Sequence, residues 1–156
     1  MLQQKIHGNS VDKLYREHVN DLLSYALHLG FDRETSKDAI NDVFYKLCIN
    51  DVDLELINNA RFYLFRALKN RLLDIYKQKR ATSELPSNIT SDDLPFTITV
   101  TIEDSLIHTE EEESLKKRVE QLVESLSDRQ REIIYLRYVQ EYDYEEISQL
   151  MDINVH

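Results

Sequence analysis

The sequence predicts an all-α protein of two small helical domains joined by an acidic linker. Apolar residues recur at spacings of three and four in most of the chain, which is the period of amphipathic helices. Glycine and proline total four of 156 residues, too few for a turn-rich β architecture. Between the helical blocks, residues 81–113 hold nine acids, both prolines and no lysine or arginine. We therefore expect domains at 1–80 and 110–156 and a linker at 81–109.

The composition is typical of a soluble cytoplasmic protein. The single cysteine, Cys48, excludes an internal disulfide. No signal peptide precedes the first helix, and no run approaches the roughly 18 apolar residues of a membrane span. The formal net charge is −10. Since duplex DNA repels such a chain at long range, any contact with nucleic acid has to be local and assisted by a partner.

The first domain is expected to contain three helices that bury one core. The first covers 10–29 and stops at Gly30, a residue favoured just past a helix end. The second covers about 32–50, and the third covers 60–80 after a short acidic loop. The expected N-caps are Ser10, Asp32 and Asn58 or Asn59.

The third helix, Ala60–Arg80, is the strongly basic block of this acidic chain. It carries seven arginines and lysines but one acid, Asp74. Its inward face is expected to hold Phe62, Phe65, Leu68, Leu72 and Ile75. A local excess of about six positive charges indicates either a solvated helix face or a surface that meets a polyanion.

The linker and the second domain carry three further signals. Phe96–Ile102 alternates apolar and threonine residues, which suits an extended strand laid on a partner or a disordered piece. A helix from about Glu110 is followed by two capped helices, one opened by Ser127 with Gln130 and one by Asp143. The last helix and its turn form the first half of a helix-turn-helix. Asn154 would cap the recognition helix, which we expect to be missing because the sequence ends at His156.

In this order, the segments resemble a sigma factor of the sigma-70 family, of the extracytoplasmic function type. LYREH at 14–18 and DAINDVF at 38–44 are similar to the family's first conserved region, which docks on RNA polymerase. YLFRALKNRLLD at 63–74 is similar to the helix that opens and reads the minus-ten promoter element. LSDRQRE at 126–132 and YEEI at 144–147 resemble the domain that recognises the minus-thirty-five element. The chain departs from the family in having no tryptophan and in placing Asp152 where a turn glycine is common.

The resemblance implies a transcription initiation factor that binds core RNA polymerase and directs it to specific promoters, where it opens and reads the minus-ten element. It assigns polymerase docking to Asp38, Asn41, Asp42, Val43, Phe44 and Leu47. It assigns promoter DNA to Arg61, Tyr63, Arg66, Lys69, Asn70, Arg71, Lys77, Lys79 and Arg80. Arginine and lysine suit phosphate, and asparagine suits base edges. An anti-sigma factor, membrane-anchored in some cases, is a further implied partner.

Competing interpretations remain for several of these residues. Val43, Phe44 and Leu47 also suit the core, which leaves the polar docking residues as the contact set. Asp74 is expected to orient Asn70 or Arg71. Three arginines of the second domain either touch phosphate or pair with nearby acids; they are Arg129, Arg131 and Arg137, and the acids are Glu132 and Glu141.

Two other classes of protein fit the sequence less well. A stand-alone helix-turn-helix regulator needs basic charge near its motif, but residues 139–156 contain no lysine or arginine. An enzyme is not expected, because glycine-rich phosphate loops, cysteine–histidine clusters and convergent carboxylates are all missing. We expect no catalytic residue, metal, cofactor or small-molecule substrate.

Overall fold

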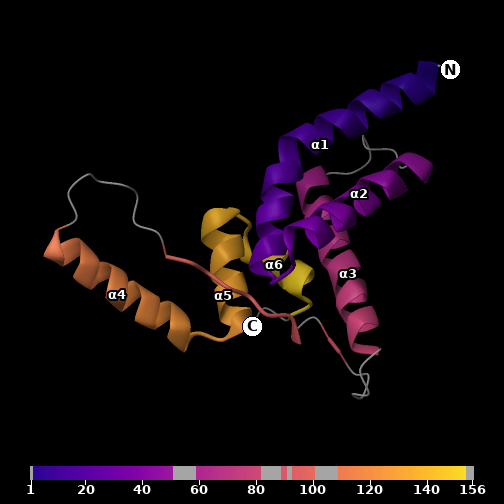
Figure 1. The fold of residues 1–156 in the computed structure, drawn as a ribbon. Coiled ribbons are helices and arrows are strands. Elements are labelled where there is room, and N and C mark those ends of the chain that lie inside the picture. The colour runs from indigo at the N-terminus through magenta and orange to yellow at the C-terminus, as the bar shows by residue number, and fades with distance from the viewer. Residues whose placement is uncertain (1, 51–58, 82–88, 91–92, 101–108, 154–156) are drawn as a thin grey trace.

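The computed structural model describes residues 2–50, 59–81, 89–90, 93–100 and 109–153, with side chains from residue 10 onward. Its elements, in chain order, are α1 Leu2–His28, α2 Arg33–Ile49, α3 Ala60–Ala81, α4 Glu110–Ser125, α5 Asp128–Ile134, the π-helix η3 Tyr135–Val139 and α6 Tyr144–Met151 (Figure 1). This described part of the chain contains no strand. The prediction of an all-α fold is confirmed.

Helices α1, α2 and α3 pack against one another around a shared apolar core. The Asp32 side chain caps α2 by accepting the Thr35 backbone N–H, as expected. Asn59 caps α3 by accepting the Phe62 backbone N–H at 3.1 Å, which settles which of the two candidate asparagines has this role. Phe65, Leu68 and Leu72 are fully buried, so the predicted inward face of α3 is confirmed at its centre.

The first helix is longer than its expected range. It begins at Leu2, so Ser10 lies inside α1 and does not cap it. The added residues include glutamine and lysine, whose straight side chains lose little freedom in a helix. Gly30 follows the helix end with a φ of +87°, a conformation that favours glycine. A Cβ at Gly30 would also lie 2.9 Å from Cγ of Pro95, so the turn and the linker both require glycine here.

The linker segment 93–100 is extended but packs on this chain's own helices. Its Thr97 backbone N–H donates to the His28 carbonyl of α1 at 2.9 Å, and its Phe96 N–H donates to Asp128 Oδ1 of α5 at 3.0 Å. Phe96 is fully buried. Figure 1 shows this segment crossing α5 below α1. The expectation of an arm on a partner or a disordered piece is therefore wrong for residues 96–100, because Phe96 has a binding site within the chain. Residues 101–102 lie outside the described part.

The second domain opens and closes its helices with the expected caps. Ser127 and Gln130 form a reciprocal capping box at the start of α5. Asp143 accepts the Glu146 backbone N–H and begins α6. Asp152 ends α6 with φ 54° and ψ 48°, the left-handed conformation that aspartate tolerates in place of glycine. The predicted recognition helix would begin at residue 154, which lies outside the described residues.

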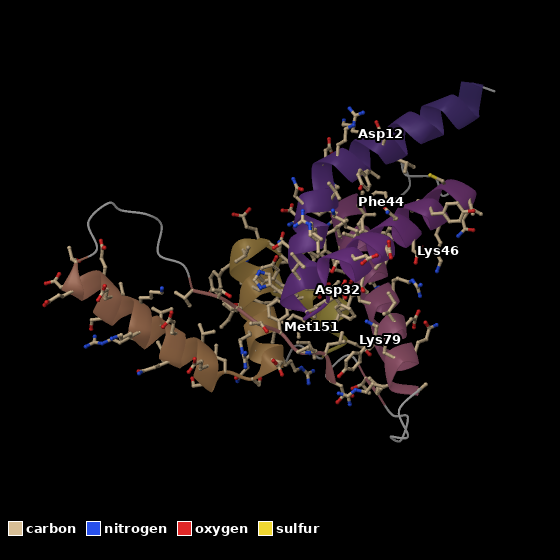
Figure 2. All side chains as sticks on the ribbon, viewed as in Figure 1. Asp12, Asp32, Phe44, Lys46, Lys79 and Met151 are labelled. Atoms are coloured by element: carbon tan, nitrogen blue, oxygen red, sulfur yellow. The ribbon has the colours of Figure 1, made fainter. Side chains whose placement is uncertain are left out.

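Helix α4 lies apart from the remaining helices. None of its residues is buried, and Leu115 and Leu122 on its apolar face are 60% and 66% exposed. Figure 2 shows its side chains projecting into open space around the helix. In contrast, η3 and α6 contribute Tyr135, Leu136 and Ile147 to the same core as the first domain, and Ile133 of α5 packs against this core. A search of the described residues found no helix with the length and apolarity of a membrane span.

Candidate nucleic-acid interface

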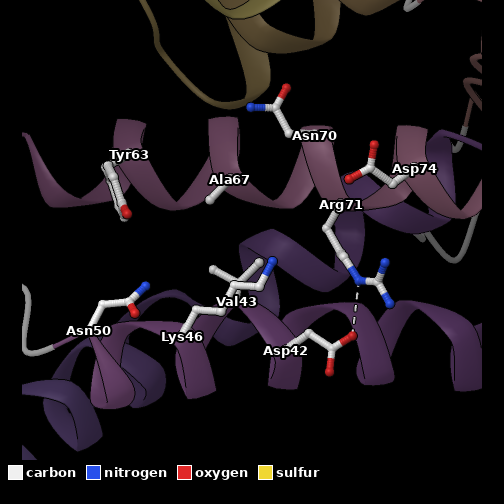
Figure 3. Close-up of a pocket in the computed structure, with 9 residues that line it drawn as sticks. All are labelled: Asp42, Val43, Lys46, Asn50, Tyr63, Ala67, Asn70, Arg71 and Asp74. Atoms are coloured by element: carbon white, nitrogen blue, oxygen red, sulfur yellow. Dashed lines mark hydrogen bonds and ion pairs between the residues drawn. The ribbon is translucent and has the colours of Figure 1, made fainter.

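A groove of about 230 Å³ runs between α2 and α3 and brings residues of both predicted sites together. Its lining residues are Asp42, Val43, Lys46, Asn50, Tyr63, Ala67, Asn70, Arg71 and Asp74. Figure 3 shows Tyr63, Ala67 and Arg71 on the side of α3 that faces α2, whereas Asn70 points away from α2 toward the C-terminal domain. The groove therefore combines one aromatic ring with charges of both signs.

The ion pair at the floor of this groove differs from the expected one. Arg71 Nε donates to Asp42 Oδ2 at 3.0 Å, so a predicted DNA residue holds a predicted docking residue (Figure 3). The sequence predicts that Asp74 orients Asn70 or Arg71. In the structure Asp74 lines the groove, and the carboxylate on Arg71 comes from α2 instead. The pair links α2 to α3 across the groove, with the Arg71 and Asp42 side chains 30% and 47% exposed.

The predicted polymerase-docking residues of α2 form two sets, one buried and one exposed. Val43, Phe44 and Leu47 are buried, and Phe44 packs edge-on against Tyr15 of α1 at a ring distance of 5.1 Å. Asp38 and Asn41 are exposed on the opposite face of the helix. The three apolar members thus belong to the core, and the exposed polar members are the ones available to a partner.

The predicted DNA residues of α3 also form two sets, one exposed to solvent and one in contact with the second domain. Arg66, Asn70, Lys77, Lys79 and Arg80 are exposed, as a DNA-contacting surface requires. Tyr63 is 39% exposed at the groove. Lys69 and Arg61, by contrast, contact the second domain. Arg66, Lys69 and Lys77 border a second groove of about 370 Å³, closed on its other side by Gln149, Leu150 and Asp152 around the end of α6.

Lys69 is almost fully buried and lies at the centre of the contact between the domains. Its Nζ donates to Glu132 Oε1 of α5 at 2.8 Å, and the Tyr25 hydroxyl of α1 donates to the same oxygen at 2.5 Å. We call Tyr25, Lys69 and Glu132 the interdomain triad. Two donors on one carboxylate oxygen compensate the loss of water around Glu132.

Arg61 makes the second polar contact between the domains. Its guanidinium donates to the backbone and side-chain oxygens of Gln140. It also lies 4.6 Å from the ring centroid of Tyr142 and 5.0 Å from that of Phe65. Asp21 of α1 approaches it at 3.9 Å. These contacts leave Arg61 turned toward the second domain instead of toward solvent.

Aromatic rings fill the space around the triad. This aromatic cluster consists of Tyr25, His28, Phe65, Phe96, Tyr135 and Tyr142. Burial is the main cause that raises the pKa of Tyr25, and the nearby Glu132 carboxylate adds to it. Burial likewise raises the pKa of Tyr135 and of Tyr142, against a lowering effect of Arg61. The three phenols are therefore held neutral in the folded chain.

We expect the fold to lose stability above about pH 10, the ordinary pKa of tyrosine. A phenol whose folded pKa is raised contributes stability that is fully present below the unfolded pKa and is lost as pH rises toward the folded value. Each such tyrosine gives a slope of about 1.4 kcal/mol per pH unit in this window. Urea unfolding between about pH 9 and pH 11 measures the slope.

The variant Tyr142→Phe tests the cause of this slope. The Tyr142 hydroxyl is the one buried side-chain polar atom without a hydrogen-bond partner among the described residues, so its removal should not weaken the fold at neutral pH. The loss of unfolding free energy per pH unit above about pH 10 should become smaller by the contribution of one tyrosine. Tyr45→Phe, at a position 65% exposed on α2, is the control and should leave the slope unchanged. An unchanged slope in Tyr142→Phe would contradict the assignment.

Tyr25 and Glu132 were not predicted as partners of Lys69. One local signal was present: Lys69 lies four residues after Phe65 and three before Leu72, on the apolar stripe of α3. A cation in that register predicts a buried partner, although the partner's identity is not local. Arg131 contacts Asp128 and the Leu126 carbonyl, and Arg137 contacts the Tyr142 carbonyl and the Tyr144 ring. These partners differ from the expected Glu132 and Glu141, and contact of these arginines with phosphate stays a prediction.

A two-domain helical chain with a basic helix in one domain and a helix-turn-helix start in the other defines a class, the DNA-binding transcription factors. Comparison with known proteins narrows this class to one family. The model of sigma-70 region 2 matches residues 14–82, and that of sigma-70 region 4 matches residues 116–156. The chain is 25% identical over 147 residues to the RNA polymerase sigma factor YlaC of Bacillus subtilis, covering 93% of this chain and 81% of that protein.

A second relative is the ECF RNA polymerase sigma factor SigM of Bacillus subtilis, 23% identical over 145 residues, which covers 93% of this chain and 83% of SigM. No solved structure matches the chain significantly. The chain belongs to the sigma-70 family, as a sigma factor of the extracytoplasmic function type. It is a transcription initiation factor that directs RNA polymerase to promoters, and the stand-alone regulator is not favoured. The family consists of initiation factors, not enzymes.

Proposed function

We propose that α2 docks this sigma factor on core RNA polymerase while α3 opens and reads the minus-ten element. The observation that carries the proposal is the groove between these helices, which joins predicted docking and DNA residues through the Asp42–Arg71 ion pair. Because α2 and α3 also share one apolar core, a partner bound on α2 would fix the position of α3. The proposed domains are 1–80 for both tasks, 81–109 as linker and 110–156 for upstream promoter contacts.

The side chains of α3 suit DNA whose strands have separated. Arg66, Lys77, Lys79 and Arg80 are exposed cations that can position phosphates. Tyr63 offers a ring on which an unpaired base can stack, and the groove beside it has room for small planar groups. Lys69 and Arg61 join this set once they leave their partners in the second domain. Asn70, on the ridge between the two grooves, is the residue able to read a base edge.

Run-off transcription with core polymerase tests the proposal directly. The chain should support transcription from a specific promoter with core enzyme and should bind that promoter specifically only when core enzyme is present. The net charge of −10 is the physical reason for this dependence. Specific promoter binding by the chain alone would instead support a stand-alone regulator. Failure of every promoter to respond, with core enzyme bound, would contradict the proposal.

The charge reversal Asp38→Lys should weaken binding to core polymerase by about 12- to 150-fold, since a hydrogen bond to a charged group contributes about 1.5–3 kcal/mol. Asp38 is exposed on α2, so the substitution should not lower the unfolding midpoint of the chain. Asp42 is a less clean test because its reversal also breaks the pair with Arg71. Fluorescence titration with core enzyme measures the affinity.

Glu34→Lys is the matched control for Asp38→Lys. It makes the same charge change at another exposed position of α2, outside the proposed docking set. Its polymerase affinity should stay within about twofold of the unmodified chain, a difference of about 0.4 kcal/mol. Equal weakening in both variants would show a general effect of charge and would remove Asp38 from the docking surface. An anti-sigma factor, membrane-anchored in some members, is the regulatory partner we propose by family analogy alone.

A further inference from the structure

Helix α4 carries an apolar stripe that the other described elements leave uncovered. Leu115 and Leu122 are 60% and 66% exposed, and none of residues 110–125 is buried. Leu115, Val119, Leu122 and Leu126 follow one another at alternating spacings of four and three residues. This is the spacing of heptad positions d and a, which form the seam of a coiled coil. The stripe therefore has the pattern of a helix that packs lengthwise against another helix.

The corner between α4 and α5 holds this stripe away from the chain's own core. Two residues, Leu126 and Ser127, connect the helices, and Ser127 is fixed by the capping box of α5. The Arg131 guanidinium donates to the Leu126 carbonyl from Nη2 at 2.9 Å and from Nε at 3.2 Å. Figure 1 shows α4 extending from this corner away from the remaining helices. Because the connection is short and hydrogen-bonded, the stripe stays open to another molecule.

We propose that α4 binds the α4 helix of a second copy of this chain in a parallel, two-stranded coiled coil. The β-branched Val119 occupies position a, and Leu115 and Leu122 occupy position d, the combination that favours two parallel strands. A two-fold axis along the seam makes every contact occur twice. This self-association goes beyond the proposed function and does not rest on it.

Charged residues beside the stripe favour this partner and this direction. Glu111 lies at position g and Lys116 at the next position e, and these positions face each other across a parallel pair. The dimer therefore gains two Glu111–Lys116 ion pairs between the copies. Within one chain, Lys116 Nζ lies 3.8 Å from Glu120 Oε1, with the two side chains 44% and 43% exposed, so this loose pair leaves Lys116 accessible. An antiparallel pair with the same apolar layers would place Lys116 opposite Val123 and lose this attraction.

The acidic start of α4 and the short seam limit the strength of this dimer. Four glutamates, at 110–113, begin each helix, so a parallel pair brings two acidic ends together. Salt screens charges as exposed as these, which reduces the repulsion. The stripe extends over about two heptads and buries less surface than a standard protein interface. We therefore expect a weak dimer, with a dissociation constant in the micromolar range.

Sedimentation velocity of the full chain, from low to high micromolar concentration, tests the self-association. We expect monomer at the lowest concentrations and dimer at the highest. Leu122→Ala should raise the dissociation constant about tenfold or more, because each dimer loses two leucines from its seam. Gln121→Ala, at an exposed position outside the seam, is the control and should change it less than about twofold. A chain that stays monomeric throughout, or a dimer that Leu122→Ala does not weaken, would overturn the proposal.

Two charge variants test the partner and the direction together. Glu111→Lys and Lys116→Glu should each weaken self-association, because each places like charges at the facing g and e positions. An equimolar mixture of the two variants should associate about fivefold more tightly than either alone, because both ion pairs re-form between unlike copies. Glu113→Lys makes the same charge change on the outer face of α4, and its mixture with Lys116→Glu should show no gain beyond the average of its components. A mixture of Glu111→Lys and Lys116→Glu that is no tighter than its components would overturn the parallel coiled coil.

Discussion

Replacing Phe96 by alanine is expected to lower the free energy of unfolding by roughly 3–5 kcal/mol, the usual cost of truncating a buried phenylalanine. Phe96 has no exposed surface and contacts rings from both domains. A residue in a flexible spacer would cost about 0.5 kcal/mol or less on the same change. Chemical denaturation monitored by circular dichroism gives the difference directly.

The neighbouring variant Thr97→Ala is the matched control for Phe96→Ala. Its side chain is exposed, and its contact with His28 comes from the backbone N–H, which alanine retains. It should change the unfolding free energy by less than about 0.5 kcal/mol. If Phe96→Ala were as mild as Thr97→Ala, the linker would not be packed between the domains. Loss of a single cooperative transition in Phe96→Ala would instead show that this ring couples the two domains.

Local chemistry in the sequence predicts most helix ends of this fold. Asp32, Ser127 and Asp143 cap the helices that they were expected to cap, because capping depends on residues only two or three positions away. Helix α3 begins at Ala60 as expected and ends one residue later than expected. The π-helix η3 was not predicted. Its closing bond, from the Gln140 N–H to the Tyr135 carbonyl, has no distinctive sequence signature.

The contact between the domains could not be predicted from the sequence, for a different reason. Lys69 and Glu132 are 63 positions apart, and their pairing depends on how two helical units dock. The family resemblance placed Lys69 with the DNA-contacting cations, although its register matched the buried stripe. For the same reason the linker sequence suggested an arm on a partner or a disordered piece. The alternation at residues 96–102 indicates an extended segment, but not the surface on which its apolar side lies. The role of Lys69 at DNA stays a prediction.

The variant Tyr63→Ala should reduce promoter opening by about 5- to 150-fold, since stacking of a base on an aromatic ring contributes about 1–3 kcal/mol. The ring lies 39% exposed at the mouth of the α2–α3 groove, so its loss should cost little fold stability. Permanganate reactivity of thymines in the promoter, measured with saturating core polymerase, reports the opened strands. Polymerase affinity should remain unchanged, because Tyr63 is outside the docking set.

Two companion variants test whether the effect of Tyr63→Ala is specific to this ring. Tyr45→Ala removes another exposed ring, one that lies on α2 and does not line the groove, and should leave opening intact. Asn70→Ala should lower opening at some promoters more than at others, because an amide that reads base edges discriminates among sequences whereas a stacking ring does not. A uniform loss in Asn70→Ala would assign Asn70 to phosphate positioning. Normal opening in Tyr63→Ala would place the unpaired bases elsewhere, and the basic groove beside α6 would then be the remaining surface of α3 able to hold them.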